Sequence, residues 1–552
     1  FFSRRTMAYD LKRAPNAAAS SEGPKRVLVM DKCDKSAVEV LSKAGIQADE
    51  KSGLSEAELI EIMPQYDAMV VRSATKVTAA VIQAATKMKI IGRAGVGVDN
   101  IDIPAATNQG VVVVNSPQGN TTSAAEHTWA MIMSMARQIP QAHNKLKQGV
   151  WDRKSFMGME MENRTLGILG FGNIGKRVAK YGLAFGMKVM AYDPFVTAEQ
   201  GAKLHVTMAE MSEIFAAADV ITLHLPSIKE TQKIINATTI ATMKKGVILA
   251  NVARGECVDE AAVAEAVKSG HVARAALDVF APEPLAKESP LLECDNIITT
   301  PHLGASTQEA QVKVAVDVCE QIREVFNGGA AHAALNIPTM KAHLIDPVKH
   351  LLSIAEKLGC VMVQLAEKKI KSIGLDVCGV PENANLSPVT TCFLKGFLSR
   401  ISMDSSVNFV NAPALIKVHG IDVDAKYEPH ENFEKCVSAT AVFEDGSKLQ
   451  LAGSHFDTTK SDRLLEIDSL PLDVTLKGWM LFVRYPDKPG MIGRVGSVIG
   501  NHNINISVFQ VTPTEAAGAA MVVAMESELT EDMLAGLKKE IPEITSARIV
   551  LV

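Results

Sequence analysis

The stretch "TLGILGFGNIGKRVAKYGLAFGMKVMAYDP", residues 165–194, decides the fold of the central part of the chain. An apolar run of strand length leads into a loop with the spacing Gly170-x-Gly172-x-x-Gly175, and the residues that follow have helical spacing. A second apolar run then ends at Asp193, 18 residues beyond Gly175. A strand, a glycine loop, a helix and a strand that ends in an acid predict a βαβ unit that binds a dinucleotide.

Each glycine of the loop has its own task in such a unit. Gly170 permits a tight turn, Gly172 lets the backbone approach a pyrophosphate, and Gly175 lets helix and strand pack closely. Asp193 would accept hydrogen bonds from the adenosine ribose and repel a 2′-phosphate, so we expect NAD rather than NADP. The alternative, a glycine turn in an ordinary α/β unit, would not need the aspartate. The predicted cofactor-binding residues of this unit are Gly170, Gly172, Asn173, Ile174, Gly175 and Asp193.

Polar side chains follow three further apolar runs of the same series. Arg254 lies in "ILANVARGECVDE", Glu283 in "ALDVFAPEP" and His302 in "IITTPH". Because the carboxyl ends of strands in a wound sheet share one crevice, we expect these side chains to converge on the nicotinamide end of the cofactor site. Taken singly, they could be a surface cation, a solvated turn acid and a strand cap. Further predicted cofactor contacts are Pro226, Ala253, Asp278 and His302.

The segment "TPHLGAST", residues 300–307, places His302 at a strand end. Pro301 restricts the approach of the strand, and Gly304 is expected to allow the turn that follows. A histidine held there suits general acid–base chemistry, because its charge changes near neutral pH.

Length, charge and cysteine usage restrict the class of protein. The 552 residues predict about three or four domains. With 57 basic and 62 acidic side chains the net charge is −5, which offers no basic excess to a nucleic acid. No apolar run approaches the roughly 18 residues that a membrane span needs. The eight cysteines form no C-x-x-C pair, which predicts free thiols in a reducing compartment and neither a disulfide framework nor a metal site.

The N-terminal segment differs from the rest of the chain. Residues 1–24 are rich in Arg, Ser and Ala, and their only acids are Asp10 and Glu22. Two interpretations stay open, a remnant of an organelle transit peptide and a disordered tail. The protein would therefore be cytoplasmic, or would lie in a plastid or the mitochondrial matrix.

Beyond this segment the pattern changes three times. From Lys25, strand-length apolar runs alternate with helices in two consecutive series, which predicts two parallel sheets covered by helices. The helix after His302 is expected to return the chain to the first of them. After Ile337, helices and strands mix, with a hairpin predicted at Asp445-Gly446. The last unit, from about Leu470, has the ferredoxin-like order β-α-β-β-α-β.

These motifs resemble the D-2-hydroxyacid dehydrogenase family, and the resemblance covers nearly all of the chain from Lys25. It rests on "VVRSATKVT", "GRAGVGVDNID", "NSPQGNTTSAAE", "WDRKSFMG", "GILGFGNIG", "NVARGECVDE", "LDVFAPEP" and "PHLGAST". Within the family the chain looks like the long-form members, whose ACT domain loop appears here as "YPDKPGMIGRVG" followed by "NHNINIS".

The resemblance implies an α/β fold in which a Rossmann-type NAD domain is inserted in a flavodoxin-like substrate domain. An α+β intervening domain, similar to an allosteric substrate-binding domain, and a ferredoxin-like ACT regulatory domain would follow. The implied boundaries are a tail at 1–24, the substrate-binding domain at 25–117 and 302–335, the NAD-binding domain at 118–301, the intervening domain at 336–475 and the ACT domain at 476–552.

The activity that the resemblance implies is NAD-dependent oxidation of 3-phosphoglycerate to 3-phosphooxypyruvate, the first step of L-serine biosynthesis, with feedback by L-serine. Arg254 would hold the substrate carboxylate, His302 would be the acid–base and Glu283 its partner. The implied substrate-binding residues are Arg72, Ser73, Lys76, Arg93, Gly95, Val96 and Arg254. The implied serine contacts are Tyr485, Asp487 and Asn505, beside a helix opened by Pro489-Gly490.

Other functions remain open at this point. A glyoxylate or hydroxypyruvate reductase, or another D-2-hydroxyacid dehydrogenase, would have the same fold. A corepressor or scaffold that senses NAD would lack turnover, and the ACT domain could serve assembly alone. We expect no metal, no nucleic acid partner, no membrane partner and a homo-oligomer, either a dimer or a tetramer.

Overall fold

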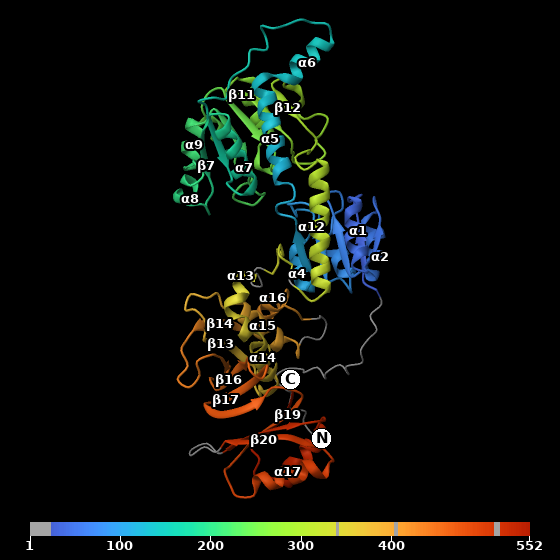
Figure 1. Cartoon of the computed structure of the whole chain (residues 1–552), viewed down its shortest axis with the longest axis vertical. Helices are drawn as coiled ribbons and strands as arrows, with labels where there is room; N and C mark the ends of the chain where they lie inside the picture. The colour runs from blue at the N-terminus through green and yellow to red at the C-terminus, as the bar shows by residue number, and fades with distance from the viewer. Residues whose placement is uncertain (1–23, 330, 338–341, 402–406, 513–518) are drawn as a thin grey trace.

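The protein is elongated in its computed structural model, with the unit that contains the glycine loop at the top of Figure 1 and the C-terminal unit at the bottom. The structure describes residues 24–329, 331–337, 342–401, 407–512 and 519–552. The predicted N-terminal tail or transit remnant, apart from Pro24, lies outside the described residues. In the part of the chain that is described, no helix is long and apolar enough to cross a membrane.

The first unit is a parallel sheet with the strand order β2-β1-β3-β4-β5, which is the flavodoxin-like order. The strands inside this sheet are largely apolar, such as the fully buried "AMVV" of β3, because helices cover both faces, whereas the edge strand β2 is the polar and partly exposed "QADE". The strands are β1 (Arg26–Val29), β2 (Gln47–Glu50), β3 (Ala68–Val71), β4 (Ile90–Arg93) and β5 (Val112–Asn115). The helices between them are α1 (Lys35–Lys43), α2 (Glu56–Ile62), α3 (Ala79–Ala84) and α4 (Ile103–Gln109).

The second unit is a seven-stranded sheet with the order β12-β11-β10-β9-β6-β7-β8, the doubly wound order of a dinucleotide-binding domain. Its strands are β6 (Thr165–Leu169), β7 (Lys188–Tyr192), β8 (Thr207–Met208), β9 (Val220–Leu223), β10 (Val247–Asn251), β11 (Val272–Leu277) and β12 (Ile297–Thr299). Its helices are α5 (Thr121–Arg137), α6 (Ile139–Lys147), α7 (Asn173–Ala184), α8 (Ala198–Ala202), α9 (Met211–Ala217), α10 (Ala237–Ala241) and α11 (Glu260–Lys268). The predicted fold class is confirmed.

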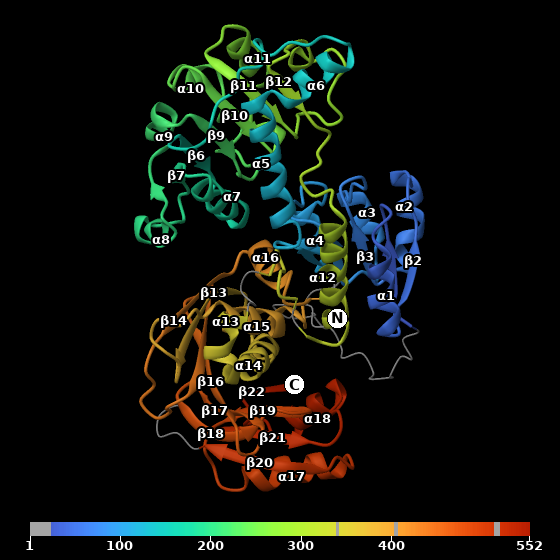
Figure 2. The ribbon, with the colours of Figure 1, turned by 45° about the horizontal axis from the view of Figure 1, so that its top comes forward.

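The chain passes between these two units twice. It enters the second unit between β5 and α5, and it returns between β12 and α12 (Gln308–Phe326). α12 lies against the first sheet, where Val314 and Val318 share a hydrophobic core with Val27. The two passages meet where the hydroxyls of Ser123 and Thr307 share a 2.6 Å hydrogen bond. Figure 2 shows α5 on the side of the second unit and α12 alongside the first.

The intervening unit is a mixed six-stranded sheet covered by two helices that pack on each other. Its helices are α13 (Ala342–Ile345), α14 (Leu352–Leu365), α15 (Ser387–Leu398) and α16 (Ala412–Val418). Its strands are β13 (Ile370–Cys378), β14 (Asp422–Tyr427), β15 (Cys436–Phe443), β16 (Lys448–Phe456), β17 (Ser461–Ile467) and β18 (Leu470–Thr475). The predicted Asp445-Gly446 hairpin joins β15 and β16, and Gly446 has a left-handed φ of 82°.

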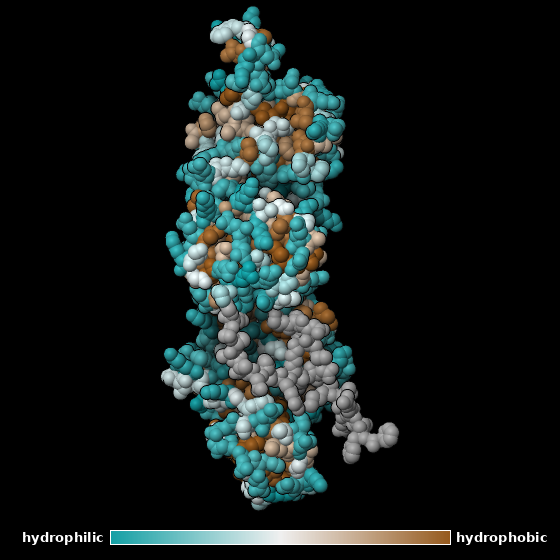
Figure 3. Space-filling view, turned by 90° about the vertical axis from the view of Figure 1, so that its right-hand side faces the viewer, coloured by the Kyte–Doolittle hydropathy of each residue, from teal (hydrophilic) through white to brown (hydrophobic). Residues whose placement is uncertain are grey.

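The last unit has the predicted ferredoxin-like element order. Its elements are β19 (Trp479–Tyr485), α17 (Met491–Asn501), β20 (Ile506–Thr512), β21 (Ala519–Met525), α18 (Glu531–Glu540) and β22 (Ser546–Leu551). The helices cover one face of the sheet, and the other face packs on the intervening unit, because Met480, Phe482 and Val550 belong to that unit's core. The face of the molecule in Figure 3 is mostly hydrophilic, with apolar side chains in small separate groups.

Candidate active site

The glycine loop lies between β6 and α7, and its geometry explains all three glycines. Gly170 has a φ of 95°, and a Cβ there would lie 2.4 Å from the carbonyl oxygen of His224. A Cβ on Gly175 would lie 2.2 Å from the carbonyl oxygen of Gly170. A Cβ on Gly172 would meet open space, and Gly172 caps α7 without a side-chain hydrogen bond. The free N–H groups of α7 are therefore accessible to a phosphate, and the loop fits NAD.

Asp193 follows β7 and faces this loop. Its carboxylate accepts hydrogen bonds from the backbone N–H groups of Phe171 and Phe195, both at 2.9 Å. The carboxylate is thus held beside the glycine loop, at the carboxyl end of the sheet. Asn173, Ile174 and Pro226 lie at the same end of the sheet, and Ala253 follows β10 there. Their contacts with the cofactor remain predictions.

His302 and Glu283 are brought together, as their sequence positions suggested. The imidazole Nδ1 lies 2.9 Å from Oε2 and 3.1 Å from Oε1 of Glu283. Glu283 also accepts a hydrogen bond from the N–H of Phe280. The two side chains remain 44% and 38% exposed, so a substrate can reach the imidazole. Because Glu283 occupies Nδ1, Nε2 is the nitrogen available for proton transfer.

The backbone after β12 turns first at His302 and then at Gly304. His302 has a left-handed φ of 54°, whereas Gly304 has no positive φ. Gly304 lies, as expected, in a turn, which is closed by the N–H of Ser306 donating to the carbonyl of Leu303. A Cβ on Gly304 would lie 3.0 Å from the side chain of Val252, which would have to shift slightly. The left-handed backbone conformation, which is uncommon for residues other than glycine, thus occurs at the predicted acid–base residue His302. Such conformations are typical of functional sites.

Hydrogen bonds to Asp278 stabilise this turn. It is fully buried, and its carboxylate accepts hydrogen bonds from the N–H groups of Leu303 and Gly304 and from the hydroxyl of Thr300. Nε2 of His127 lies 3.2 Å from the same carboxylate. Burial raises the pKa of Asp278, but these partners outweigh it and keep the pKa below its usual value. The carboxylate positions the backbone that follows His302 and the side chain of Thr300 that precedes it. A contact of Asp278 with the cofactor remains a prediction.

Arg254 is positioned by two neighbouring elements. A Cβ on the next residue, Gly255, would lie 2.1 Å from the backbone of Phe280, the same residue that donates to Glu283. The guanidinium Nε lies 3.0 Å from Oδ2 of Asp99, a residue of the loop after β4. Arg254 thus spans the gap between the two sheets, with Nη1 bonded to the carbonyl of Ala253.

Three arginines concentrate positive charge at this edge. Arg93 ends β4, and burial together with the neighbouring charges of Arg254 and Arg72 lowers the pKa of Arg93 to about 10. Nε of Arg93 is buried and has no hydrogen-bond partner. Gly95 has a φ of 155°, which favours glycine, and a Cβ there would displace the end of the Arg93 side chain. A bound anion would relieve the repulsion among these cations.

The other predicted substrate residues lie in the loops around this cluster. Ser73 and Lys76 are exposed in the loop after β3, and the carbonyl of Val96 accepts from Asn115 at 2.6 Å. Two residues of the site were not predicted, Asp99 and His127. Both lie within quoted motifs or helices, but their partners are 155 and 151 residues away in sequence, and only the fold brings them together.

Comparison with known proteins identifies the family. Residues 129–304 match the NAD-binding domain of the D-isomer specific 2-hydroxyacid dehydrogenases, residues 347–468 the D-3-phosphoglycerate dehydrogenase intervening domain, and residues 479–541 the ACT domain. The D-3-phosphoglycerate dehydrogenase of Synechocystis sp. is 43% identical over 520 residues, which cover 93% of this chain and 92% of that protein. That of Bacillus subtilis is 39% identical and covers 95% and 99%.

The chain belongs to the D-3-phosphoglycerate dehydrogenase family.

Solved structures agree with this membership of the family. A protein from Thermus thermophilus is 31% identical with a TM-score of 0.53, covering 56% of this chain and 99% of that one. The D-lactate dehydrogenase from Aquifex aeolicus, solved with NAD and lactic acid, is 28% identical with a TM-score of 0.50, covering 55% and 96%. The predicted cofactor, NAD, is confirmed by the matching NAD-binding domain.

In the ACT domain of this family member, the predicted effector residues differ in how exposed they are. Gly490 caps α17 with a φ of 86° and no side-chain hydrogen bond, so the expected helix N-terminus is present. Asp487 and Asn505 are exposed, whereas Tyr485 is 3% exposed and packs in the hydrophobic core of the domain. Burial, and then the charge of Asp487, raises the pKa of Tyr485. A direct contact of serine with Tyr485 would require this core side chain to move.

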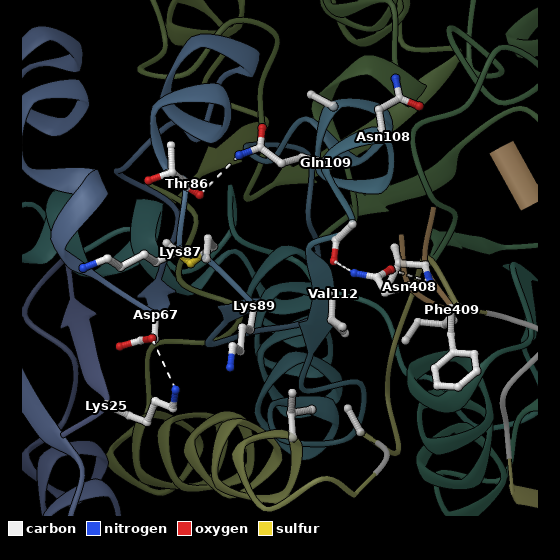
Figure 4. Close-up of a pocket in the computed structure, with 18 of the residues that line it drawn as sticks. Lys25, Asp67, Thr86, Lys87, Lys89, Asn108, Gln109, Val112, Asn408 and Phe409 are labelled. Atoms are coloured by element: carbon white, nitrogen blue, oxygen red, sulfur yellow. Dashed lines mark hydrogen bonds and ion pairs between the residues drawn. The ribbon is translucent and has the colours of Figure 1, made fainter. Parts of the chain in front are cut away.

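A large cavity lies elsewhere, between the N-terminal unit and the intervening domain of this family member (Figure 4). Its volume is about 1810 Å³, and its lining includes Lys25, Asp67, Lys89 and Val112. These residues stand at the amino ends of the strands of the first sheet, opposite to Arg93. Ligands of such sheets bind at the carboxyl ends, so this cavity is not the active site.

Proposed function

We propose that the protein oxidises 3-phosphoglycerate to 3-phosphooxypyruvate with NAD. The observation that supports the proposal is that Arg254, Glu283 and His302 follow β10, β11 and β12 at the carboxyl edge of the sheet where the glycine loop also lies, with His302 bonded to Glu283 and Arg254 close to Arg93. An acid–base, a carboxylate ligand and extra cations are what a phosphorylated 2-hydroxy acid requires.

The residues have complementary tasks in this reaction. Arg254 binds the substrate carboxylate through its guanidinium, which suits planar oxygen pairs. Nε2 of His302 removes the hydroxyl proton, and Glu283 stabilises the imidazolium that results. Bound NAD supplies the acceptor for the hydride from the substrate carbon. Arg93 and Arg72 remain for the substrate phosphate, because Arg254 is engaged with the carboxylate.

A substrate comparison tests the proposal. The rate of NADH formation is measured with 3-phosphoglycerate, D-glycerate and D-lactate, and the reverse rate with glyoxylate and hydroxypyruvate. We expect kcat/KM for 3-phosphoglycerate to exceed that for D-glycerate by about a hundredfold, because a charge-assisted contact contributes about 1.5–3 kcal/mol. Faster turnover of hydroxypyruvate or glyoxylate than of the phosphorylated pair would assign the protein to the reductases instead.

We infer that L-serine regulates this enzyme through the ACT domain. The N-terminus of α17 at Gly490 has no side-chain hydrogen bond to its N–H groups, so these groups can bind the carboxylate of serine. Asp487 is exposed three residues earlier and can accept from the ammonium group of serine.

We infer further that the protein is a homo-oligomer. α6 and the loop after it expose apolar side chains, with Trp151 78% and Met157 80% exposed, and Figure 1 shows α6 standing out from the top of the molecule. Exposed apolar groups of this size favour contact with a second copy. Analytical ultracentrifugation of wild type and of Trp151→Ser tests this, and a monomeric wild type would contradict it.

A further inference from the structure

Two cysteines of the intervening domain lie side by side. Cys378 is the last residue of β13 and Cys436 the first residue of β15, and they are direct partners in the antiparallel register. Their sulfur atoms are 3.1 Å apart although 58 residues separate them in sequence. All eight cysteines are free in the structure, as the sequence predicted.

The backbone geometry of this pair suits a covalent bond. Direct partners in an antiparallel ladder have Cα atoms about 4.5–5.5 Å apart, within the range of about 4.4–6.8 Å that disulfides require. The two strands would therefore keep their register when the bond forms. We propose that Cys378 and Cys436 form a reversible disulfide, with hydrogen peroxide as the oxidant and a dithiol as the reductant.

The chemistry balances with one peroxide for each pair. One thiolate attacks a peroxide oxygen, which gives a sulfenic acid and releases one water once a proton is taken up. The second thiolate attacks that sulfur, the S–S bond forms, and the hydroxyl leaves as a second water. Two thiols are oxidised and one peroxide is reduced to two waters. A dithiol reverses the bond by thiol–disulfide exchange.

The proposed reaction requires a small oxidant to enter from the end of the sheet. Both sulfurs are buried, but the adjoining residues Gly379 and Lys435 are exposed. Burial, and next the bond to Cys378, raises the pKa of the Cys436 thiol, so the reactive thiolate is scarce at neutral pH. Oxidation should therefore accelerate as the pH rises.

The disulfide would join the two ends of the segment from Cys378 to Cys436, and this segment contacts the N-terminal unit. The loop contains α15, α16 and β14, and it contains Asn408, whose side-chain amide donates to the carbonyl of Gly110 at 2.7 Å (Figure 4). Asn408 attaches the intervening domain to the end of α4. A disulfide would restrict the unfolded chain of this loop, and the oxidised domain should resist heat better.

The test counts thiols in the full-length protein. Reduced wild type is treated with peroxide, quenched and denatured, and we expect it to lose two of its eight thiols. Mass spectrometry should find the Cys378 and Cys436 peptides joined and lighter by two hydrogen atoms. Cys378→Ser and Cys436→Ser should lose no thiol pair. The control Cys392→Ser, which removes another buried cysteine, should lose the same pair as wild type.

The stability readout is independent of the thiol count. The melting temperature of oxidised wild type should lie several degrees above that of the reduced form, and dithiothreitol should reverse the difference. Retention of all eight thiols, a bond between other cysteines, or overoxidation to sulfinic acid would overturn the proposal.

Discussion

Nε of Arg254 lies 3.0 Å from Oδ2 of Asp99, so a guanidinium of the NAD-binding domain is held by a carboxylate of the N-terminal unit. In the proposed reaction Asp99 would compete with the substrate carboxylate for Arg254, and its charge offsets part of the positive charge of the arginines. It also restrains the guanidinium before substrate arrives.

Asp99→Asn should therefore lower KM for 3-phosphoglycerate and leave kcat nearly unchanged. The amide oxygen can still accept from Nε, whereas the negative charge is gone. The decrease should be about two- to fivefold, because exposed charge pairs contribute up to about 1 kcal/mol. Steady-state kinetics at low and high salt check this, since the difference should shrink as salt screens the site. An increase of KM would contradict it.

His302→Asn should nearly abolish turnover while NAD binding persists. Asparagine tolerates the left-handed backbone at this position, so the turn should survive. The expected loss in kcat is about two orders of magnitude or more, the usual contribution of a positioned acid–base. NAD affinity is measured by titration calorimetry, and Glu288→Gln, an exposed acid of a nearby loop, serves as the control. Turnover near the wild-type rate would remove His302 from the mechanism.

Asp193→Ala should weaken NAD and relax the discrimination against NADP. The carboxylate stands beside the glycine loop, where it would meet a 2′-phosphate at close range. The ratio of kcat/KM for the two cofactors should shift by about ten- to a hundredfold, since opposed like charges cost several kcal/mol. A second variant, Asp193→Asn, removes the negative charge but keeps an oxygen that can accept from the N–H of Phe171. It therefore distinguishes the effect of the charge from the effect of losing support for the loop. An unchanged ratio in both variants would exclude Asp193 from the ribose site.

Asp278→Asn should destabilise the protein in a pH-dependent way. The folded-state pKa of Asp278 is lowered, so its carboxylate contributes stability above its usual pKa of 3.8. The contribution is lost as pH falls through the lower folded value. The difference in unfolding free energy between wild type and variant, about 2–3 kcal/mol near neutral pH, should shrink below about pH 4. Urea titrations at several pH values check this, and a difference independent of pH would contradict it.

L-Serine should bind the wild type and inhibit turnover, and Asp487→Ala should weaken both effects. The exposed carboxylate of Asp487 is expected to accept from the effector's ammonium. Calorimetric titration and turnover at rising serine concentration are measured side by side, with the exposed acid Asp532→Ala as the control. Absence of both heat and inhibition in wild type would leave the ACT domain with a role in assembly alone.

Local spacing explains what the sequence could predict. The β6–glycine loop–α7 unit is contiguous, so its residues have the same neighbours in any fold that forms it. The same holds for the hairpin at Asp445-Gly446. The proximity of His302 and Glu283 could be predicted because consecutive strands of a wound sheet end at the same edge.

The rest depended on contacts between distant segments. The Arg254–Asp99 pair forms across two domains, and the partners are 155 residues apart. The left-handed turn fell on His302, although glycine is the usual residue for such a backbone, because Asp278 fixes the flanking N–H groups. The Cys378–Cys436 pair follows from the β13–β15 register, which no spacing rule in the sequence encodes.

The double passage of the chain between the first two domains has a mechanical consequence. The two crossings are fastened together at Ser123 and Thr307 by a 2.6 Å hydrogen bond, and they stand where α5 and α12 begin. A body attached to another at two adjacent points keeps one soft degree of freedom, rotation about the line that joins them. Any movement of the unit that carries His302 relative to the unit that carries Arg93 would then follow a single arc, and each return along it would bring Arg254 back to the same place beside Asp99.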